Sequence, residues 1–206
     1  MSERPLPRPV ELLTSVPGDG PLYRSSYDGW LDLIRRAERR LILASYSFGH
    51  YDSDDSPEHP LFGALADVMH QRPQLAVDLL LSMQTLKKQG EHPSPFDLQR
   101  RLAKRVADNW VGGVRLPRLL GYAAEWEQDG TGRAKAVQHA KFAVCDGRWV
   151  LVTSANLTRA AFEENMEIGV VIEDAGLAGR LEGLVDSWIL AGRSGDGGRG
   201  LREISA

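Results

Sequence analysis

The residues best suited to chemistry lie in the last third of the chain. His139 and Lys141 are two residues apart in an otherwise apolar run, AVQHAKFAVCD (136–146), which predicts a β-strand. Side chains two apart on a strand point the same way, so we expect the imidazole and the ammonium to lie side by side. Burying both groups is costly unless each has a partner. Taken alone, the pair would also fit an edge strand that faces water.

Further polar residues follow this run at short spacing. Ser154 ends the next predicted strand, Asn156 comes two residues later, and Glu167 is the second residue of a third predicted strand. Phosphodiesters carry a negative charge that repels nucleophiles, so an enzyme that cleaves them needs cationic and neutral donors around the phosphate. A lysine, an asparagine and a serine are donors of these two kinds, and a neutral imidazole is available as a nucleophile near neutral pH.

The order and spacing of these residues resemble the phospholipase D superfamily. The signature of that family is H-x-K-x4-D, followed shortly by G-S-x-N; here the first part ends at Asp146, and the second reads Thr153-Ser-Ala-Asn156. Thr153 therefore stands where the family usually has glycine. The resemblance is close over residues 137–171 and looser near residues 25–47.

The resemblance implies a mechanism and a role for each residue. His139 would attack phosphorus and form a covalent phosphohistidine, which water then hydrolyses. Lys141, Asn156 and Ser154 would bind the phosphate oxygens, and Glu167 would hold the other ring nitrogen of His139. The resemblance implies no metal ion and no other cofactor.

Asp146 has a different expected role although it belongs to the signature. It lies five residues beyond Lys141, so strand alternation turns it to the opposite face. Asp146-Gly147 is a strong turn signal between two predicted strands. We therefore interpret Asp146 as a structural residue of the motif.

The mechanism also needs an acid to protonate the leaving oxygen. In the superfamily a second histidine from a second copy of the motif does this, but no other histidine in this chain is followed by x-Lys. Two chains related by a two-fold axis could bring their His139 residues together. We expect a homodimer with a composite active site, with His50 as the alternative acid.

The expected substrate is nucleic acid, DNA or RNA. Short members of the family with one motif are mostly nucleases, and a helix predicted at 95–110 carries Arg101, Lys104 and Arg105 on one face, where they could bind the nucleic-acid backbone. The sequence also resembles the phospholipase D-like proteins of bacterial phage-defence systems, including the DISARM type, which would imply partner proteins from such a system. A lipid or small-molecule phosphodiesterase, and a subunit that only binds nucleic acid, remain alternatives.

The elements that must hold these residues alternate along the chain. Apolar periodicity predicts helices at 26–40, 61–71, 95–110 and 177–190, and strands at 41–48, 75–83, 114–122, 136–146, 148–154 and 166–174. Pro117 has no N–H to donate, so we expect the strand at 114–122 to lie at an edge of the sheet. This order predicts an α/β fold, a mixed β-sheet flanked by helices, of the phospholipase D type.

Composition predicts one globular domain in a reducing compartment. The chain has 206 residues, a net charge of −3 and a single cysteine, Cys145, so no internal disulfide can form. We expect an N-terminal arm at 1–20, the catalytic domain at 21–192 and a flexible tail at 193–206. The N-terminus has no apolar core typical of a signal peptide, and no apolar run reaches the roughly 20 residues that span a bilayer. We therefore expect a cytoplasmic protein that does not act at a membrane.

Overall fold

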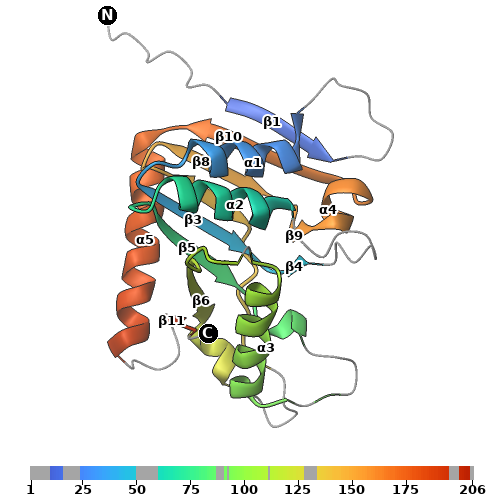
Figure 1. The fold of residues 1–206 in the computed structure, drawn as a ribbon, viewed down its shortest axis with the longest axis vertical. Helices are drawn as coiled ribbons and strands as arrows, with labels where there is room; N and C mark the ends of the chain where they lie inside the picture. Colours follow the sequence, from blue (N-terminus) through green and yellow to red (C-terminus); the bar gives the residue numbers. More distant parts are fainter. Residues whose placement is uncertain are drawn as a thin grey trace, which may run out of the picture.

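The computed structural model describes residues 10–15, 24–49, 60–86, 91, 93–110, 112–127, 134–194 and 200–204. Within these residues nine strands form one sheet in the order β11-β6-β5-β3-β7-β8-β10-β1-β2 (Figure 1). The strands are β1 (Val10–Ser15), β2 (Arg24–Ser25), β3 (Arg40–Ser45), β5 (Ala76–Leu81), β6 (Arg118–Tyr122), β7 (Phe142–Cys145), β8 (Trp149–Thr153), β10 (Glu167–Glu173) and β11 (Leu201–Glu203).

The sheet is mixed, as the sequence predicts. Strand β3 pairs in parallel with β5, which pairs in parallel with β6, whereas β3, β7, β8, β10 and β1 follow one another antiparallel. Beyond the end of β3, a short parallel pair joins β4 (Phe48–Gly49) to β9 (Leu157–Thr158). The antiparallel half holds the segments that carry the family-like motif.

Helices cover both faces of the sheet. Helices α1 (Ser26–Arg36), α2 (Pro60–Gln71) and α3 (Pro95–Asp108) pack on one face, and α5 (Ala175–Ser194) packs on the other (Figure 1). The short elements are η1 (Gln84–Leu86), η2 (Ala123–Trp126) and α4 (Arg159–Glu163). No helix in these described ranges is both long and apolar enough to cross a membrane.

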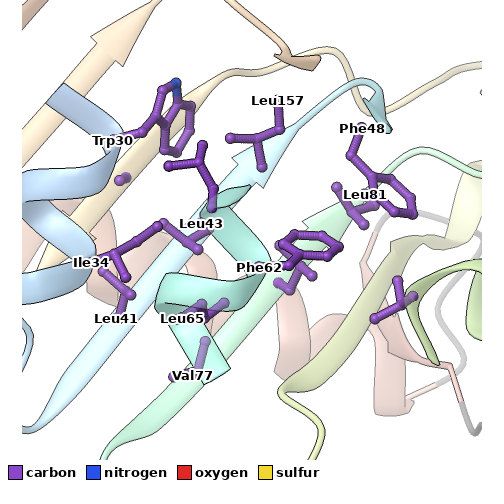
Figure 2. Packing of buried hydrophobic residues seen from close by; sticks show 14 of the residues in the cluster. Trp30, Ile34, Leu41, Leu43, Phe48, Phe62, Leu65, Val77, Leu81 and Leu157 are labelled. Carbon is purple, nitrogen blue, oxygen red and sulfur yellow. The ribbon is translucent and has the colours of Figure 1, made fainter. Parts of the chain in front are cut away.

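The larger core lies between the sheet and the helices α1 to α3. Ser25 caps α1 by accepting a hydrogen bond from the backbone N–H of Asp28, and the helix buries Trp30 and Ile34. Figure 2 shows these side chains against Leu41 and Leu43 of β3. This packing fixes β3, and with it the neighbouring strand β7, since the two strands are hydrogen-bonded partners.

Two strands in the middle of the chain differ from their predictions. The strand predicted at 136–146 begins only at Phe142, and the segment 136–141, which contains both His139 and Lys141, makes no regular ladder. Strand β6 is not an edge strand, because β11 pairs with it, and it starts after Pro117 so that the proline disturbs no ladder bond.

The chain ends also differ from expectation. Residues 10–15 of the expected arm form β1, which pairs with β10 over its whole length. Residues 201–203 of the expected tail form β11. Both segments are short and weakly patterned, and their backbone groups find partners that are distant in sequence, which local periodicity does not report. The expected loop between residues 49 and 60, with His50, lies outside the described residues.

Candidate active site

Four chain segments meet at one edge of the sheet because neighbouring strands run antiparallel. His139 and Lys141 immediately precede β7, while Ser154 and Asn156 immediately follow β8, its antiparallel partner. Glu167 is the first residue of β10, which runs antiparallel to β8. The sheet topology therefore brings the residues predicted from the sequence together where these strands begin or end. The carboxyl end of β3 lies at the same place.

The imidazole and the ammonium lie side by side. The Lys141 Nζ atom is 3.3 Å from Nδ1 of His139 and donates a hydrogen bond of 2.9 Å to the backbone oxygen of His139. The ring of Tyr46, which follows β3, lies 4.7 Å from the imidazole centroid, and Lys141 Nζ lies 5.7 Å from the centre of the same ring. Tyr46 thus contacts both members of the pair.

Sequence reasoning did not predict Tyr46. It lies inside a strong strand signal, LILASYSF (41–48), whose apolar residues suggest only packing. The one available hint was its place at the end of a buried strand, where polar side chains reach the edge of a sheet. Its contact with His139 connects segments about ninety residues apart, and such a contact becomes visible only once the strand order is known.

The turn after β8 is held by the side chain of Thr153. Its hydroxyl donates to the carbonyl oxygen of Ile168 at 3.2 Å and accepts from the backbone N–H of Ala155 at 3.0 Å. Gly169 lies opposite Thr153 in the ladder, where a Cβ atom would come within 2.8 Å of the threonine side chain. A threonine in place of the family's glycine is thus accommodated by a glycine on the neighbouring strand, and its hydroxyl stabilises the turn.

Asn156 is anchored on the other side of the site. Its Oδ1 accepts a hydrogen bond of 3.3 Å from the backbone N–H of Ser47, so its amide nitrogen remains available to donate. The buried hydroxyl of Ser45 donates to the backbone oxygen of Ser47 and accepts from the backbone N–H of Leu157. These bonds tie the end of β3 to the segment that carries Asn156.

Glu167 does not take the position that the resemblance implies. Both residues are described, and Glu167 makes no hydrogen bond with His139; instead it accepts one from the hydroxyl of Ser154 and one of 3.4 Å from the amide of Asn165. Ser154 is further bonded to the backbone of Ile168. Nδ1 of His139 faces Lys141, and the carboxylate is coupled to the site through Ser154.

A cleft of about 690 Å³ opens at this group of residues. Its polar wall includes His139, Lys141, Ser154 and Asn156, and its apolar wall consists of side chains from β7, β8 and α5: Phe142, Val152, Leu181 and Trp188. An adjoining cavity of about 310 Å³ shares His139 and Trp188. Partial burial lowers the pKa of Lys141 below its ordinary value, and the negative charge of Glu167 opposes that shift.

Asp146 lies at the opposite edge of the sheet from this cleft. Its carboxylate accepts hydrogen bonds of 2.8 to 2.9 Å from the backbone N–H groups of Glu38, Arg39 and Arg40. Its φ of 54° is in the left-handed region, which a tight hairpin turn requires. Asp146 thus joins the β7–β8 turn to the start of β3.

The three basic residues of α3 do not line the cleft. Arg101 pairs with Glu91 at 2.6 Å, and Lys104 pairs with Asp108 at 2.7 Å on the helix surface. The guanidinium of Arg105 lies 5.5 Å from the centre of the Phe48 ring, in β4. Because β4 pairs with β9, which directly follows Asn156, Arg105 is the one of the three that approaches the site.

Comparisons with known proteins identify the family. The family model described as "Cardiolipin synthase, PLD-like domain" matches residues 30–188. This chain belongs to the phospholipase D superfamily. Its matched residues include the complete site edge, from Tyr46 to Glu167, and also α5, whose Trp188 closes the phospholipase D-like cleft.

Solved structures with the same fold have low sequence identity to this phospholipase D-like chain. Nuc from Salmonella typhimurium, a phospholipase D family member, is 21% identical with a TM-score of 0.54, and the match covers 88% of this chain and 95% of Nuc. NucT from Helicobacter pylori is 16% identical with a TM-score of 0.53, covering 77% and 83%. Phosphatidylserine synthase from Haemophilus influenzae is 15% identical with a TM-score of 0.57, covering 79% of this chain and 34% of the synthase. A search of curated proteins finds no match.

Within the described residues no group of three or more histidine, cysteine, aspartate and glutamate side chains is arranged to hold a metal ion.

The buried thiol of Cys145 is also not a site residue. Desolvation raises its pKa to about 12, so it stays protonated near neutral pH.

Proposed function

We propose that this protein is a metal-independent phosphodiesterase that cleaves nucleic acid through a covalent phosphohistidine. The observation that carries the proposal is the grouping of His139, Lys141, Ser154 and Asn156 on one wall of a single cleft. An ammonium and neutral donors there can bind the two non-bridging oxygens of a phosphodiester. The imidazole beside them, exposed to solvent, can reach the phosphorus atom.

The reaction would proceed in two displacements at phosphorus. Nε2 of His139 attacks, a bond forms between nitrogen and phosphorus, and the bond to the leaving oxygen breaks as that oxygen takes a proton from an acid. Water then attacks phosphorus, and the bond between nitrogen and phosphorus breaks to release His139. The proton from the water passes to the group that had protonated the leaving oxygen. Attack by Nε2 requires the proton on Nδ1, so the bound phosphate must draw the Lys141 ammonium away from Nδ1.

The choice of nucleic acid as substrate rests on two observations. The match with Nuc covers nearly the full length of both chains, whereas the match with phosphatidylserine synthase covers about a third of the synthase. Arg105 also contributes a cation beside β4 and β9, along the edge that a polyanion leaving the cleft would follow. A role in phage defence, with partner proteins of that system, extends this proposal, and plaque counts with and without the His139→Ala variant would test it.

A lipid phosphodiesterase is the second candidate. It is favoured by the apolar wall of the cleft, with Phe142, Leu181 and Trp188, and by the similarity in fold to a phosphatidylserine synthase. A nuclease and a lipid enzyme would share the polar wall. They differ in substrate alone.

A homodimer could supply the acid that the mechanism needs, with His50, outside the described residues, as the alternative. Among the described residues the histidines are His139 and His70, and His70 lies at the end of α2 that leads into the start of β5, at the far edge of the sheet. A second copy of His139 across a two-fold axis would supply the acid. The second chain would also cover the exposed apolar side chains of Val152 and Ile168, on the sheet beside the cleft.

The test is cleavage in EDTA by wild type and by the His139→Ala variant. Single- and double-stranded DNA and RNA are assayed beside phospholipid vesicles, with His70→Ala as the matched control because it removes a histidine remote from the cleft. We expect EDTA-resistant cleavage of nucleic acid, lost in His139→Ala and kept in His70→Ala. Cleavage of the lipid alone would favour the second candidate, and nucleic-acid binding without cleavage would show a binding subunit.

A further inference from the structure

A carboxylate outside the family-like motif is completely buried behind the catalytic segment. Glu125, in η2, has no exposed surface. Its Oε2 accepts a hydrogen bond of 2.7 Å from the backbone N–H of Met83, and its Oε1 accepts one of 2.8 Å from the backbone N–H of Gln138. The hydroxyl of Ser82, which accepts a hydrogen bond of 3.2 Å from the backbone N–H of Gln84, also lowers the pKa of this carboxyl group. The carboxylate therefore connects three segments: the end of β5, η2 and the segment before β7.

The segment held in this way is the one that carries the chemistry. Residues 136–141 lack the ladder of hydrogen bonds that fixes β7, so their position depends on individual contacts. The carbonyl oxygen of Lys141 accepts a bond of 3.2 Å from the N–H of Thr153, which fixes the end next to β7. Gln138 directly precedes His139, and its N–H is bonded to Glu125, which fixes the other end.

We infer that Glu125 is a positioning residue that holds the His139–Lys141 segment in the cleft by binding the backbone of Gln138. The inference rests on the proposed function for its kinetic consequence, although the contact itself does not depend on the substrate. Glu125 touches neither His139 nor Lys141, so it acts through the backbone. It sets where the imidazole lies and takes no part in the bond changes.

The energetics of Glu125 agree with a positioning role. Desolvation raises the pKa of its carboxyl group, and the hydrogen bonds from Gln138 and Met83 oppose that rise without cancelling it. Burial therefore disfavours the charged form, so the carboxylate is an expensive way to stabilise the fold. An apolar side chain would fill this space at lower cost, but it would leave the N–H of Gln138 without an acceptor.

The experiment compares Glu125→Gln with Asp78→Asn. The glutamine keeps the shape but must turn its NH2 group toward one of the backbone N–H donors, so one bond is lost. Asp78 is the matched control, because it is also a buried carboxylate, bonded to Arg40 at 3.2 Å and Arg118 at 2.7 Å, but it lies away from the cleft. Both variants lose the charge of a buried acid, and only one loses a contact to the catalytic segment.

Two readouts are taken on the folded fraction of each protein. Hydrogen exchange of the peptide covering 134–141 should become faster in Glu125→Gln than in Asp78→Asn, while exchange in β8 stays as in wild type. The kcat for cleavage should fall by about 10²-fold in Glu125→Gln with little change in KM, because a displaced nucleophile slows the chemical step more than it weakens binding. Asp78→Asn should keep the wild-type kcat.

Separate outcomes overturn the positioning role and the proposed function. Unchanged exchange at 134–141 in folded Glu125→Gln, or an equal loss of kcat in Asp78→Asn, would overturn the positioning role. Faster exchange with no cleavage of any phosphodiester by wild type would keep the contact and refute the function. If Glu125→Gln does not fold, Glu125→Asp replaces it, since its side chain is one methylene shorter and cannot reach both Met83 and Gln138.

Discussion

At the scale of single residues, the charge of Lys141 should limit the pH range of the proposed reaction. In that mechanism the Lys141 side chain binds phosphate in its protonated form, so activity should decrease as pH rises through its pKa. Partial burial lowers that pKa, so the decrease should begin below the pH at which a free lysine, with a pKa near 10.4, would lose its charge. Removing the negative charge of Glu167 should lower the Lys141 pKa further, so Glu167→Gln should shift the alkaline limb to lower pH.

The measurement is kcat against pH from about 7 to about 11. Glu163→Gln is the control, because Glu163 is an exposed carboxylate of α4 that pairs with Arg159. Lys141→Arg should abolish the alkaline limb at a reduced rate, since a guanidinium stays charged throughout this range. An alkaline limb that is the same in wild type and Lys141→Arg would assign the titration to a different group.

Some of the site residues could be predicted from the sequence and others could not. His139, Lys141, Ser154 and Asn156 have polar side chains at fixed short spacings, so a linear pattern identifies them, and they line one cleft. Tyr46 and Glu125 have no such pattern, because their partners are distant in sequence and the contacts exist only after the sheet forms. The position of Glu167 was also beyond a linear pattern, since spacing does not determine whether its carboxylate faces Ser154 or His139.

At the scale of elements, the side chain of Asp146 holds the β7–β8 turn to the start of β3 with three hydrogen bonds, beside the backbone bond from the Asp146 N–H to the carbonyl oxygen of Arg40. Asp146→Ala should lower the free energy of unfolding by about 1–3 kcal/mol, because three backbone N–H groups lose their acceptor. Alanine also tolerates the left-handed φ of 54° less well than aspartate. The kcat of the folded enzyme should not change, because the turn and the cleft lie at opposite edges of the sheet.

The pH dependence of this effect follows from the pKa of Asp146. Desolvation alone would raise that pKa, but the N–H groups of Arg40, Glu38 and Arg39 more than compensate, so the pKa is lowered. A lowered carboxyl pKa contributes stability above the ordinary value near 3.9, and this contribution is lost as pH falls through the lowered pKa. Urea unfolding should therefore show a constant advantage of wild type over Asp146→Asn near neutral pH that shrinks in acid. An advantage that persists in acid would contradict the role of the charge.

Helices and strands with a strong apolar periodicity were predicted correctly. Segments whose structure depends on a distant strand partner were not. The helix α1 and the strand β3 carry long apolar patterns, and both formed where predicted, although α1 ends at Arg36 and Asp146 binds the N–H groups from Glu38 onward. Strands β1 and β11 are short, and their partners decide their structure. The segment 136–141 has a strand pattern but forms no regular ladder, and within it the N–H of Gln138 is bonded to a side chain, that of Glu125.

At the scale of the whole molecule, part of the sheet face on the α5 side carries exposed apolar side chains. Val152, Val170 and Leu12 stand opposite one another across β8, β10 and β1, and Ile168 lies beside them. Ile168 is 61% exposed and Val152 is 46% exposed. Val150, two residues before Val152 on β8, is buried under α5. The open face, defined here as Leu12, Val152, Ile168 and Val170, is continuous with the cleft because Val152 lines both.

A second copy of the chain is the occupant that would also complete the chemistry. An apolar sheet face beside a site whose proposed mechanism uses a second histidine would fit a two-fold interface, in which each chain covers the other's face. Mixed dimers of wild type and His139→Ala should lose activity in proportion to the content of the variant. Fully active mixed dimers would refute a shared site.

A substitution in the open face separates dimerisation from folding. Leu12→Glu introduces a charge into the open face, on β1, which carries none of the proposed site residues, so it should produce a folded monomer with little activity. Phe96→Glu is the control, because Phe96 is 64% exposed on α3, which packs on the opposite face of the sheet. We expect sedimentation to show a dimer for wild type and Phe96→Glu and a monomer for Leu12→Glu. Wild-type activity per chain should fall on dilution through the dissociation range. A wild-type monomer that retains full activity would require the acid to come from within one chain.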